Sequence, residues 1–343
     1  MKKLLNTFYV TIADAYLSLD GENIVIKRGD EELRRVPLHN LEGIVTFGRQ
    51  GASPALMRKC AAMGISLTFL SEHGRFQASI VGEERGNVLL RRTQYRFADD
   101  MAKSLEISRN ILVGKLHNSR WVLERAVRDH ALRVDVDKLK KASTFIKNAI
   151  KTLPTAATHG ELFGIEGEAA AHYFSEFDQL ILANKEDFFF RNRNRRPPLD
   201  NVNAMLSFVY TLLANDVSAA LSAVGLDPFV GFLHQDRPGR RSLALDLVEE
   251  LRAPLADRFV LKLINLRILT GGDFAQKENG AVIMLDDARK KLLAAWQERK
   301  QETLEHPFLR EKIMWGLVPH VQALLLARFL RGDLDEYPPF LWK

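Results

Sequence analysis

Residues 188–258 bring together several residue types that can do chemistry. Arginines are bunched at two places, and they are Arg191, Arg193, Arg195, Arg196, Arg237, Arg240 and Arg241. His234 lies between a Phe-Leu pair and a Pro-Gly turn, twelve residues before a helical pattern with Asp246, Glu249 and Glu250. Guanidinium groups suit bidentate contacts with phosphate, and one imidazole with carboxylates suits Mg²⁺ or Mn²⁺. The combination predicts a polyanion and a divalent metal at one place.

Each of these features also has a structural explanation. Asp246, Glu249 and Glu250 are spaced i, i+3 and i+4, so they share one helix face and would form the acidic outer side of an ordinary amphipathic helix. A lone histidine is more often a hydrogen-bonded structural residue, although His234 can fold back from its turn onto the acidic face. A metal and a phosphodiester at one site would instead indicate phosphoryl transfer, in which the metal stabilises the attacking and leaving oxygens.

A separate helical segment, 157–177, contains two glycines around Glu166. Gly164 and Gly167 each cost a helix about 1 kcal/mol relative to alanine. A helix tolerates such a cost where another helix or a ligand must come close. Glu166 lies between these two glycines.

The elements that must position these residues fall into two parts. The length of 343 residues favours two domains. Residues 1–85 contain short strand-like runs and one helix that begins at Ser53-Pro54 and ends at Gly64, residues 86–97 have the composition of a hinge, and 98–343 follow helical periodicity. We expect an α+β protein, with an N-terminal β-sandwich-like domain followed by a larger all-α C-terminal catalytic domain.

Helices are expected over 98–127, 136–153, 157–177, 201–224, 242–258, 260–270, 281–302 and 307–331. Many cations lie in the expected helix 98–127 and next to it in sequence, and we interpret them as a solvent-exposed helix face. They are Arg91, Arg92, Arg96, Lys103, Arg109, Lys115, Arg120, Arg125 and Arg128. The tail 337–343 is too rich in proline for a helix, so we expect it to be mobile or to dock on a partner.

Composition excludes several other classes. The single cysteine, Cys60, rules out an intrachain disulfide and a Cys-based zinc site, and its apolar surroundings predict a buried core residue. No run of 18 apolar residues occurs and the N-terminus resembles a strand more than a signal peptide, so we expect a cytoplasmic protein with no membrane contact. The net charge of +6 is modest, and the clustering of the arginines is more informative.

Four motifs together resemble the CRISPR-associated adaptation integrases, the family of the universal first-numbered CRISPR-associated protein. They are GIEGEAAAHYF at 164–174, RRPPLDNVNAMLSFVY at 195–210, GFLH at 231–234 and SLALDLVEELR at 242–252. The resemblance extends over nearly the whole chain. The opening residues and the segment LHNLEGIV at 38–45 are most similar to the subtype I-C branch.

The resemblance implies a set of site residues. In the family a metal is bound by the glutamate of G-x-E-G, by the histidine and by an acid on the last helix, which correspond to Glu166, His234 and Glu249. Glu168 is a chemical rival to Glu166, but the motif match favours Glu166. Asp246 matches a second acid and is expected to support the site, with a direct role left open.

The resemblance also implies an activity and partners. It predicts a homodimer formed through the β-rich domain, assembled with a small ferredoxin-like adaptation partner and carrying double-stranded DNA. The 3′-hydroxyl of a spacer precursor would attack a phosphodiester at the CRISPR repeat, inserting new spacers in antiviral defence. Metal-dependent endonuclease cleavage is the same chemistry with another nucleophile.

Two rival hypotheses come from the residues themselves. A non-catalytic DNA-binding scaffold would use the arginines and leave the carboxylates as surface acids. An unrelated helical metallohydrolase would act on small phosphate esters and would not bind duplex DNA. A carboxylate-bridged di-iron protein is disfavoured because the paired Glu-x-x-His motif is absent.

Overall fold

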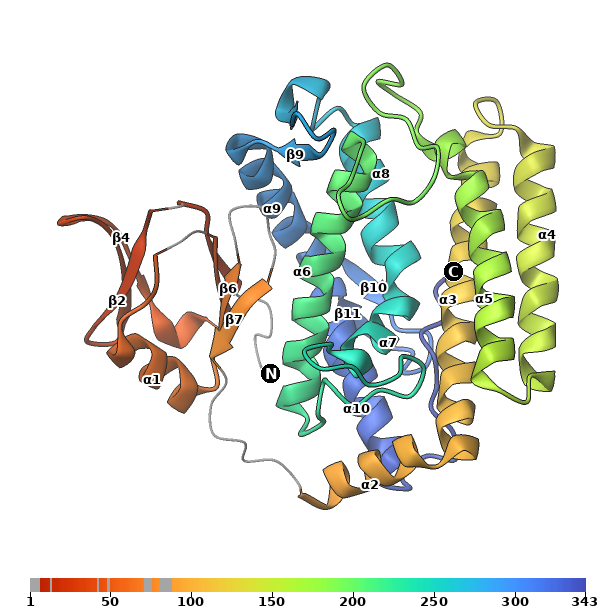
Figure 1. The fold of residues 1–343 in the computed structure, drawn as a ribbon, viewed down its shortest axis with the longest axis horizontal. Coiled ribbons are helices and arrows are strands. Elements are labelled where there is room, and N and C mark those ends of the chain that lie inside the picture. Colours follow the sequence, from red (N-terminus) through yellow and green to blue (C-terminus); the bar gives the residue numbers. More distant parts are fainter. Residues whose placement is uncertain (1–6, 13, 42, 48–49, 71–75, 81–87) are drawn as a thin grey trace. The chain divides into compact units, whose positions relative to one another are not determined.

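The computed structural model describes residues 7–12, 14–41, 43–47, 50–70, 76–80 and 88–343 (Figure 1). The chain divides into two compact units. The first comprises residues 1–85 and 284–302, and the second comprises residues 86–283 and 303–343. Residues 284–302 therefore group with the strand-rich unit, whereas the sequence prediction placed them in the helical domain.

The first unit contains two sheets and a helix. The larger sheet has the order β1-β5-β6-β7, with parallel pairing except between β6 and β7, and the smaller is the antiparallel meander β2-β3-β4. The strands are β1 (Thr7–Val10), β2 (Tyr16–Asp20), β3 (Asn23–Arg28), β4 (Glu31–Pro37), β5 (Gly43–Phe47), β6 (Ser66–Leu70) and β7 (Phe76–Ile80). The helices are α1 (Pro54–Met63) and α9 (Asp286–Gln301).

Both sheets and α1 contribute to one hydrophobic core in this unit. Leu17 and Ile24 come from the small sheet, Ile44 from the large sheet, and Leu56 and Cys60 from α1, all with fully buried side chains. Burial of Cys60 confirms its interpretation as a core residue. The Ser53 hydroxyl accepts a hydrogen bond from the Leu56 N–H, and Gly64 ends α1 in the left-handed conformation, so both helix boundaries were predicted correctly.

The second unit is mainly helical. Its helices are α2 (Val88–Asp99), α3 (Met101–His130), α4 (Val136–Thr152), α5 (His159–Ser175), α6 (Asn201–Ala223), α7 (Ser242–Leu251), the π-helical turn η4 (Arg252–Asp257), α8 (Arg258–Asn265) and α10 (Val318–Leu330). Two strand pairs accompany them: β8 (Phe274–Gln276) with β9 (Val282–Met284), whose last residue groups with the first unit, and β10 (Thr303–Glu305) with β11 (Lys312–Met314). The prediction of an all-α C-terminal part is therefore wrong in detail. The helix expected over 307–331 forms only from Val318, because Pro307 and Gly316 interrupt the segment before it.

The segment predicted as a hinge, 86–97, is helical from Val88 onward. Leu90 and Gln94, four residues apart on α2, are both buried. The Gln94 amide donates to the carbonyls of Asp227 and Val230 at 2.8 Å each. A helix that is anchored in this way to the loop before His234 is part of the helical unit and not a linker.

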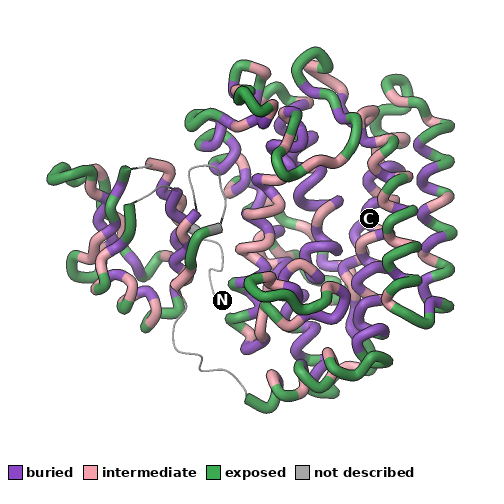
Figure 2. The backbone as a smooth tube through the Cα atoms, viewed as in Figure 1, coloured by how far each residue is buried: buried purple, intermediate pink, exposed green. Residues whose placement is uncertain are grey.

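The helices of the second unit form an outer layer and a buried centre. Helices α3, α4 and α5 pack side by side, while α6 packs against α7 and α10 (Figure 1). Figure 2 shows that α6 and α7 are largely buried and that one side of α4 is exposed. In the described part of the chain, α6 is the one helix long and apolar enough to cross a bilayer, and 61% of its most apolar window is buried inside the protein, as is usual for a core helix.

The tail 337–343 is packed into the helical unit, so the expectation that it is mobile or docks on a partner is wrong. Tyr337 and Phe340 are fully buried and Trp342 is nearly so. The Asn118 amide donates to the Phe340 carbonyl at 2.7 Å and accepts from the Trp342 N–H at 2.8 Å. Three aromatic side chains within seven residues gave the tail enough apolar surface to be held by its own chain.

Candidate active site

Helix α7 carries the three acids singled out from the sequence, and all three are buried. The side chains of Asp246 and Glu250 have no exposed surface, and that of Glu249 has 4%. The acidic outer face that was the structural alternative is therefore excluded. The three carboxylates point to different partners, so their shared spacing does not give them a shared role.

Asp246 holds the loop that carries His234. Its carboxylate accepts hydrogen bonds from the N–H groups of Phe232, Leu233 and His234 at 2.7, 3.0 and 2.9 Å. It also accepts one from His234 Nδ1 at 2.7 Å. His234 folds back onto α7 as expected, and because a carboxylate only accepts, Nδ1 donates and Nε2 is left for a ligand.

Gly231 makes this arrangement of the loop possible. A Cβ at this position would lie 2.8 Å from Ser242 Cβ and 2.9 Å from Asp246 Oδ2. Such distances are below van der Waals contact, so any side chain would push the loop away from α7. The glycine of the GFLH motif is therefore required by close packing.

Glu249 lies between two cations. Its Oε2 is 2.7 Å from Lys115 Nζ on α3, and its Oε1 is 2.9 Å from Arg252 Nη1 one turn further on. Burial by itself raises the pKa of Glu249, but the charges of Arg252 and Lys115 outweigh it, and the pKa falls to about 2. Glu249 is therefore a carboxylate at neutral pH despite its burial.

Glu166 reaches the same place from α5. Its Oε1 forms an ion pair with Lys115 Nζ, and its charge acts on Arg252. Glu168, two residues along, is exposed. A Cβ on Gly164 or Gly167 would meet nothing within 4 Å, so none of the helices that the structure describes packs against these two positions.

Two separate segments, α5 and α7, therefore meet at Lys115. The loop that carries His234 is held to α7 by Asp246, one turn before Glu249. Sequence reasoning missed Lys115 and Arg252. Lys115 was grouped with the solvated cations of α3, yet only 14% of its side chain is exposed, and the signal that could have separated it was its position in an apolar stretch next to Leu116.

The donor set fits a hard divalent cation, although the side chains are not arranged around one. Among the described residues, no three His, Cys, Asp or Glu side chains are grouped closely enough to hold a metal. The Lys115 ammonium lies where the two glutamates meet. Glu249 Oε2 is buried, and the Lys115 ammonium at 2.7 Å offsets its charge. Two carboxylates and an imidazole are ligands that Mg²⁺ or Mn²⁺ accepts.

A buried hydrogen-bond network around Asp257 adjoins Arg252, the cation that pairs with Glu249. The Asp257 carboxylate, in η4, accepts from the hydroxyls of Tyr210 and Tyr173 at 2.5 and 3.0 Å. Burial raises the pKa of Asp257 to about 6, against the lowering effect of these two hydrogen bonds and of Arg252. The Arg252 guanidinium lies 5.1 Å from the centroid of the Tyr210 ring, so its position beside Glu249 is fixed from two sides.

The seven arginines expected to bind DNA divide into two groups. Arg191, Arg195, Arg196 and Arg237 are exposed and remain candidates for phosphate contacts. The other three are at least partly buried and already donate within the protein: Arg193 to Asn203 Oδ1 at 2.6 Å, Arg240 to Ser242 Oγ at 3.3 Å and Arg241 to Asn215 Oδ1 at 3.0 Å. These three contacts fix loops, so this group positions the backbone that carries the exposed arginines and His234.

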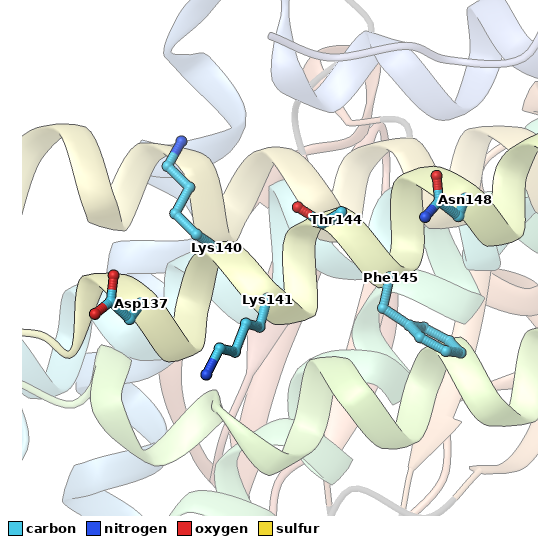
Figure 3. A pocket seen from close by; sticks show the side chains of 6 residues that line it. All are labelled: Asp137, Lys140, Lys141, Thr144, Phe145 and Asn148. Atoms are coloured by element: carbon cyan, nitrogen blue, oxygen red, sulfur yellow. The ribbon is translucent and has the colours of Figure 1, made fainter.

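A hollow of about 530 Å³ lies elsewhere, on α4 (Figure 3). Its lining comes from one side of the helix: Asp137, Lys140, Lys141, Thr144, Phe145 and Asn148. None of the candidate site residues borders it. This hollow therefore does not mark the candidate active site.

Comparison with known proteins decides the family. The family model described as CRISPR associated protein Cas1 matches residues 8–298. The chain belongs to the Cas1 family. It is 51% identical over 343 residues to a protein of Chlorobaculum tepidum named CRISPR-associated endonuclease Cas1 1, with both chains covered completely.

Two solved structures show the same fold. One is a casposase bound to its integration product, with a TM-score of 0.84, 23% identity, and coverage of 99% of this chain and 95% of the casposase. The other is a Cas6-RT-Cas1–Cas2 complex, with a TM-score of 0.84 and 21% identity, in which this chain is covered completely and 36% of the larger chain is matched. The mixed α+β architecture, strand-rich at the N-terminus and helical beyond it, agrees with these neighbours.

Proposed function

We propose that this Cas1 family member is a divalent-metal-dependent DNA integrase and endonuclease that inserts spacers into a CRISPR array. The observation that carries the proposal is that Glu166 from α5 and Glu249 from α7 meet at Lys115, while Asp246 on α7 holds His234. The same motifs that identify the family supply Glu166, His234 and Glu249. These three residues would hold Mg²⁺ or Mn²⁺, which when bound would stabilise negative charge on the attacking and leaving oxygens.

The residues of the chain have distinct tasks in this reaction. Glu249 remains ionised because Arg252 offsets its burial, and Asp246 orients the His234 ring so that Nε2 is presented. In strand transfer the 3′-oxygen of the incoming DNA forms a new bond to phosphorus, and the phosphodiester bond on the opposite side breaks to leave a 3′-hydroxyl. The attacking hydroxyl loses a proton and the leaving oxygen gains one.

The DNA and protein partners are part of the same proposal. Exposed Arg191, Arg195, Arg196 and Arg237 would contact the backbone of double-stranded DNA, as spacer precursor or repeat. The solved casposase carries an integration product, and the solved Cas6-RT-Cas1–Cas2 assembly includes a Cas2 partner. We propose a homodimer through the strand-rich unit, bound to a small ferredoxin-like partner of that kind, in the cytoplasm. The segment 38–45 supports assignment to the subtype I-C branch.

Substitutions of the three proposed ligands test the site. Glu166→Gln, Glu249→Gln and His234→Ala should each reduce the joining of a 3′-hydroxyl DNA end to a repeat by about 100-fold or more, because each removes a ligand. Glu168→Gln on the exposed side of α5 is the matched control and should behave as wild type. Duplex binding, measured by fluorescence anisotropy, should be unchanged in all four. Unimpaired strand transfer in the three site variants would show that the chemistry occurs elsewhere.

One observation favours a second candidate function, a non-catalytic DNA-binding scaffold. Lys115 already neutralises both glutamates, and the described side chains form no three-donor cluster. A scaffold would bind duplex DNA through its exposed arginines and show no Mn²⁺-dependent nicking. The purified protein, assayed on supercoiled DNA with Mn²⁺ and with a chelator, distinguishes the two functions.

A further inference from the structure

Lys115 occupies the centre of the candidate site, although it is neither an acid nor an imidazole. Its ammonium contacts Glu166 Oε1 from α5 and lies 2.7 Å from Glu249 Oε2 on α7. Its side chain is 14% exposed, so water does not fully solvate the charge. These carboxylates are the two proposed to bind metal, and the inference that follows rests on the proposed function.

The backbone of Lys115 is fixed against α7 by its neighbours on α3. A Cβ on Gly114 would lie 3.0 Å from Glu250 Cγ and 3.1 Å from Pro339 Cβ, so α3 and α7 approach closely at this level. One turn further on, the Asn118 amide donates to the Glu250 carbonyl at 2.7 Å. The lysine is therefore aimed at the glutamates by packing, whereas its flexible four-carbon side chain allows the ammonium to move.

Electrostatics explains what a lysine does at this position. Two ionised carboxylates that face each other in a poorly solvated site repel each other unless a cation lies between them. Arg252 compensates only in part, because it contacts Glu249 Oε1 and its guanidinium is held against Tyr210. A divalent ion at the two carboxylates would remove the need for the ammonium and would repel it.

We propose that Lys115 is a positioning residue that acts as an internal counter-ion for the metal site. Its ammonium holds Glu166 and Glu249 together before a divalent ion binds, and the ion displaces it on entry. Two consequences follow. Lys115 competes with the metal, so it weakens metal binding. It also stabilises the metal-free protein, so it reduces the gain in stability that the metal brings.

Metal binding in the absence of DNA tests this inference. The full chain with Lys115→Met should bind Mn²⁺ with a Kd about tenfold lower than wild type, measured by electron paramagnetic resonance of free Mn²⁺, because a competing charge is gone. Its Tm without metal should fall, and the rise in Tm on adding Mn²⁺ should exceed that of wild type. Lys147→Met, the same change on an exposed residue of α4, is the matched control and should leave both measurements unchanged.

Two further variants keep the outcomes distinct. Lys115→Arg keeps the charge and should retain a Kd near that of wild type, and Lys115→Gln replaces the methionine variant if circular dichroism shows that the latter does not fold. An unchanged or higher Kd in Lys115→Met or Lys115→Gln overturns the inference. If Glu249→Gln also binds Mn²⁺ as wild type does, the proposed metal site itself fails. If Glu249→Gln loses Mn²⁺ while the lysine variants match wild type, only the role of Lys115 is refuted.

Discussion

Glu250 provides a sharp prediction, because it is buried next to Glu249 but serves the tail and not the metal site. Its carboxylate accepts from the Tyr337 hydroxyl at 2.7 Å, the Phe340 N–H at 2.7 Å and the Gln322 amide at 3.0 Å. Burial raises the pKa of Glu250 from 4.5 to about 8, against the lowering effect of these three donors. The folded protein therefore binds a proton that the unfolded chain releases.

The sign and the size of the effect follow from this pKa. Between pH 4.5 and 8 the folded state binds more protons than the unfolded state, so the free energy of unfolding falls as the pH rises. Each pKa unit corresponds to about 1.4 kcal/mol, so Glu250 alone lowers the stability by about 5 kcal/mol across this range as an upper estimate. Glu250→Gln removes this titrating group. The free energy of unfolding of the variant minus that of wild type should therefore be larger at pH 8 than at pH 5.

The assay is urea unfolding followed by tryptophan fluorescence, at pH 5, 6, 7 and 8, for wild type and Glu250→Gln. The difference between the two free energies of unfolding isolates Glu250, because the other groups titrate alike in both proteins. Glu168→Gln removes an exposed carboxylate and serves as the control. A Glu250→Gln difference that stays constant from pH 5 to 8 would refute the reasoning.

Two further substitutions test the packing around the site. Gly231→Ala places a methyl group against Ser242 and Asp246, so it should cost about 1–3 kcal/mol of stability and weaken Mn²⁺ binding; a variant with normal Tm and Mn²⁺ affinity would contradict the close approach. Trp342→Ala removes a buried side chain of the tail and should lower the free energy of unfolding in urea by about 3–5 kcal/mol. Leu132→Ala, which truncates a fully exposed side chain, is the control and should change it very little. Equal effects of the two substitutions would show that the tail is not packed into the helical unit.

The sequence indicated which segments carry the site residues but not which partner each side chain binds. The motifs around Glu166, His234 and Glu249 predicted three segments at one place. In the structure Lys115 joins α5 to α7, and Asp246 joins the His234 loop to α7, so a common metal site for the three side chains stays a prediction. Helical spacing placed Asp246 and Glu249 on one face, yet it cannot show that the first binds backbone N–H groups and the second binds cations. That division depends on a loop whose path is set by Gly231.

Other misses have the same physical origin, because they depend on contacts between residues far apart in the chain. Lys115 is one of many cations near α3, and only the packing of α3 against α5 and α7 turns it inward. The segment 88–97 resembled a hinge because its anchor, the contact of Gln94 with the Asp227 carbonyl, spans more than a hundred residues. The tail looked unstructured locally, and its partner Asn118 lies on α3.

The three hydrogen bonds from successive N–H groups to Asp246 also affect how parts of the site can move. His234 and Glu249 are joined through one helix and one carboxylate, so they shift together as a single rigid part. Glu166 belongs to another part, on α5, and Lys115 on α3 is the charge that joins the two. A change in the separation of α5 from α7 would therefore move Glu166 away from both Glu249 and His234, and a probe pair placed on these two helices would report it directly.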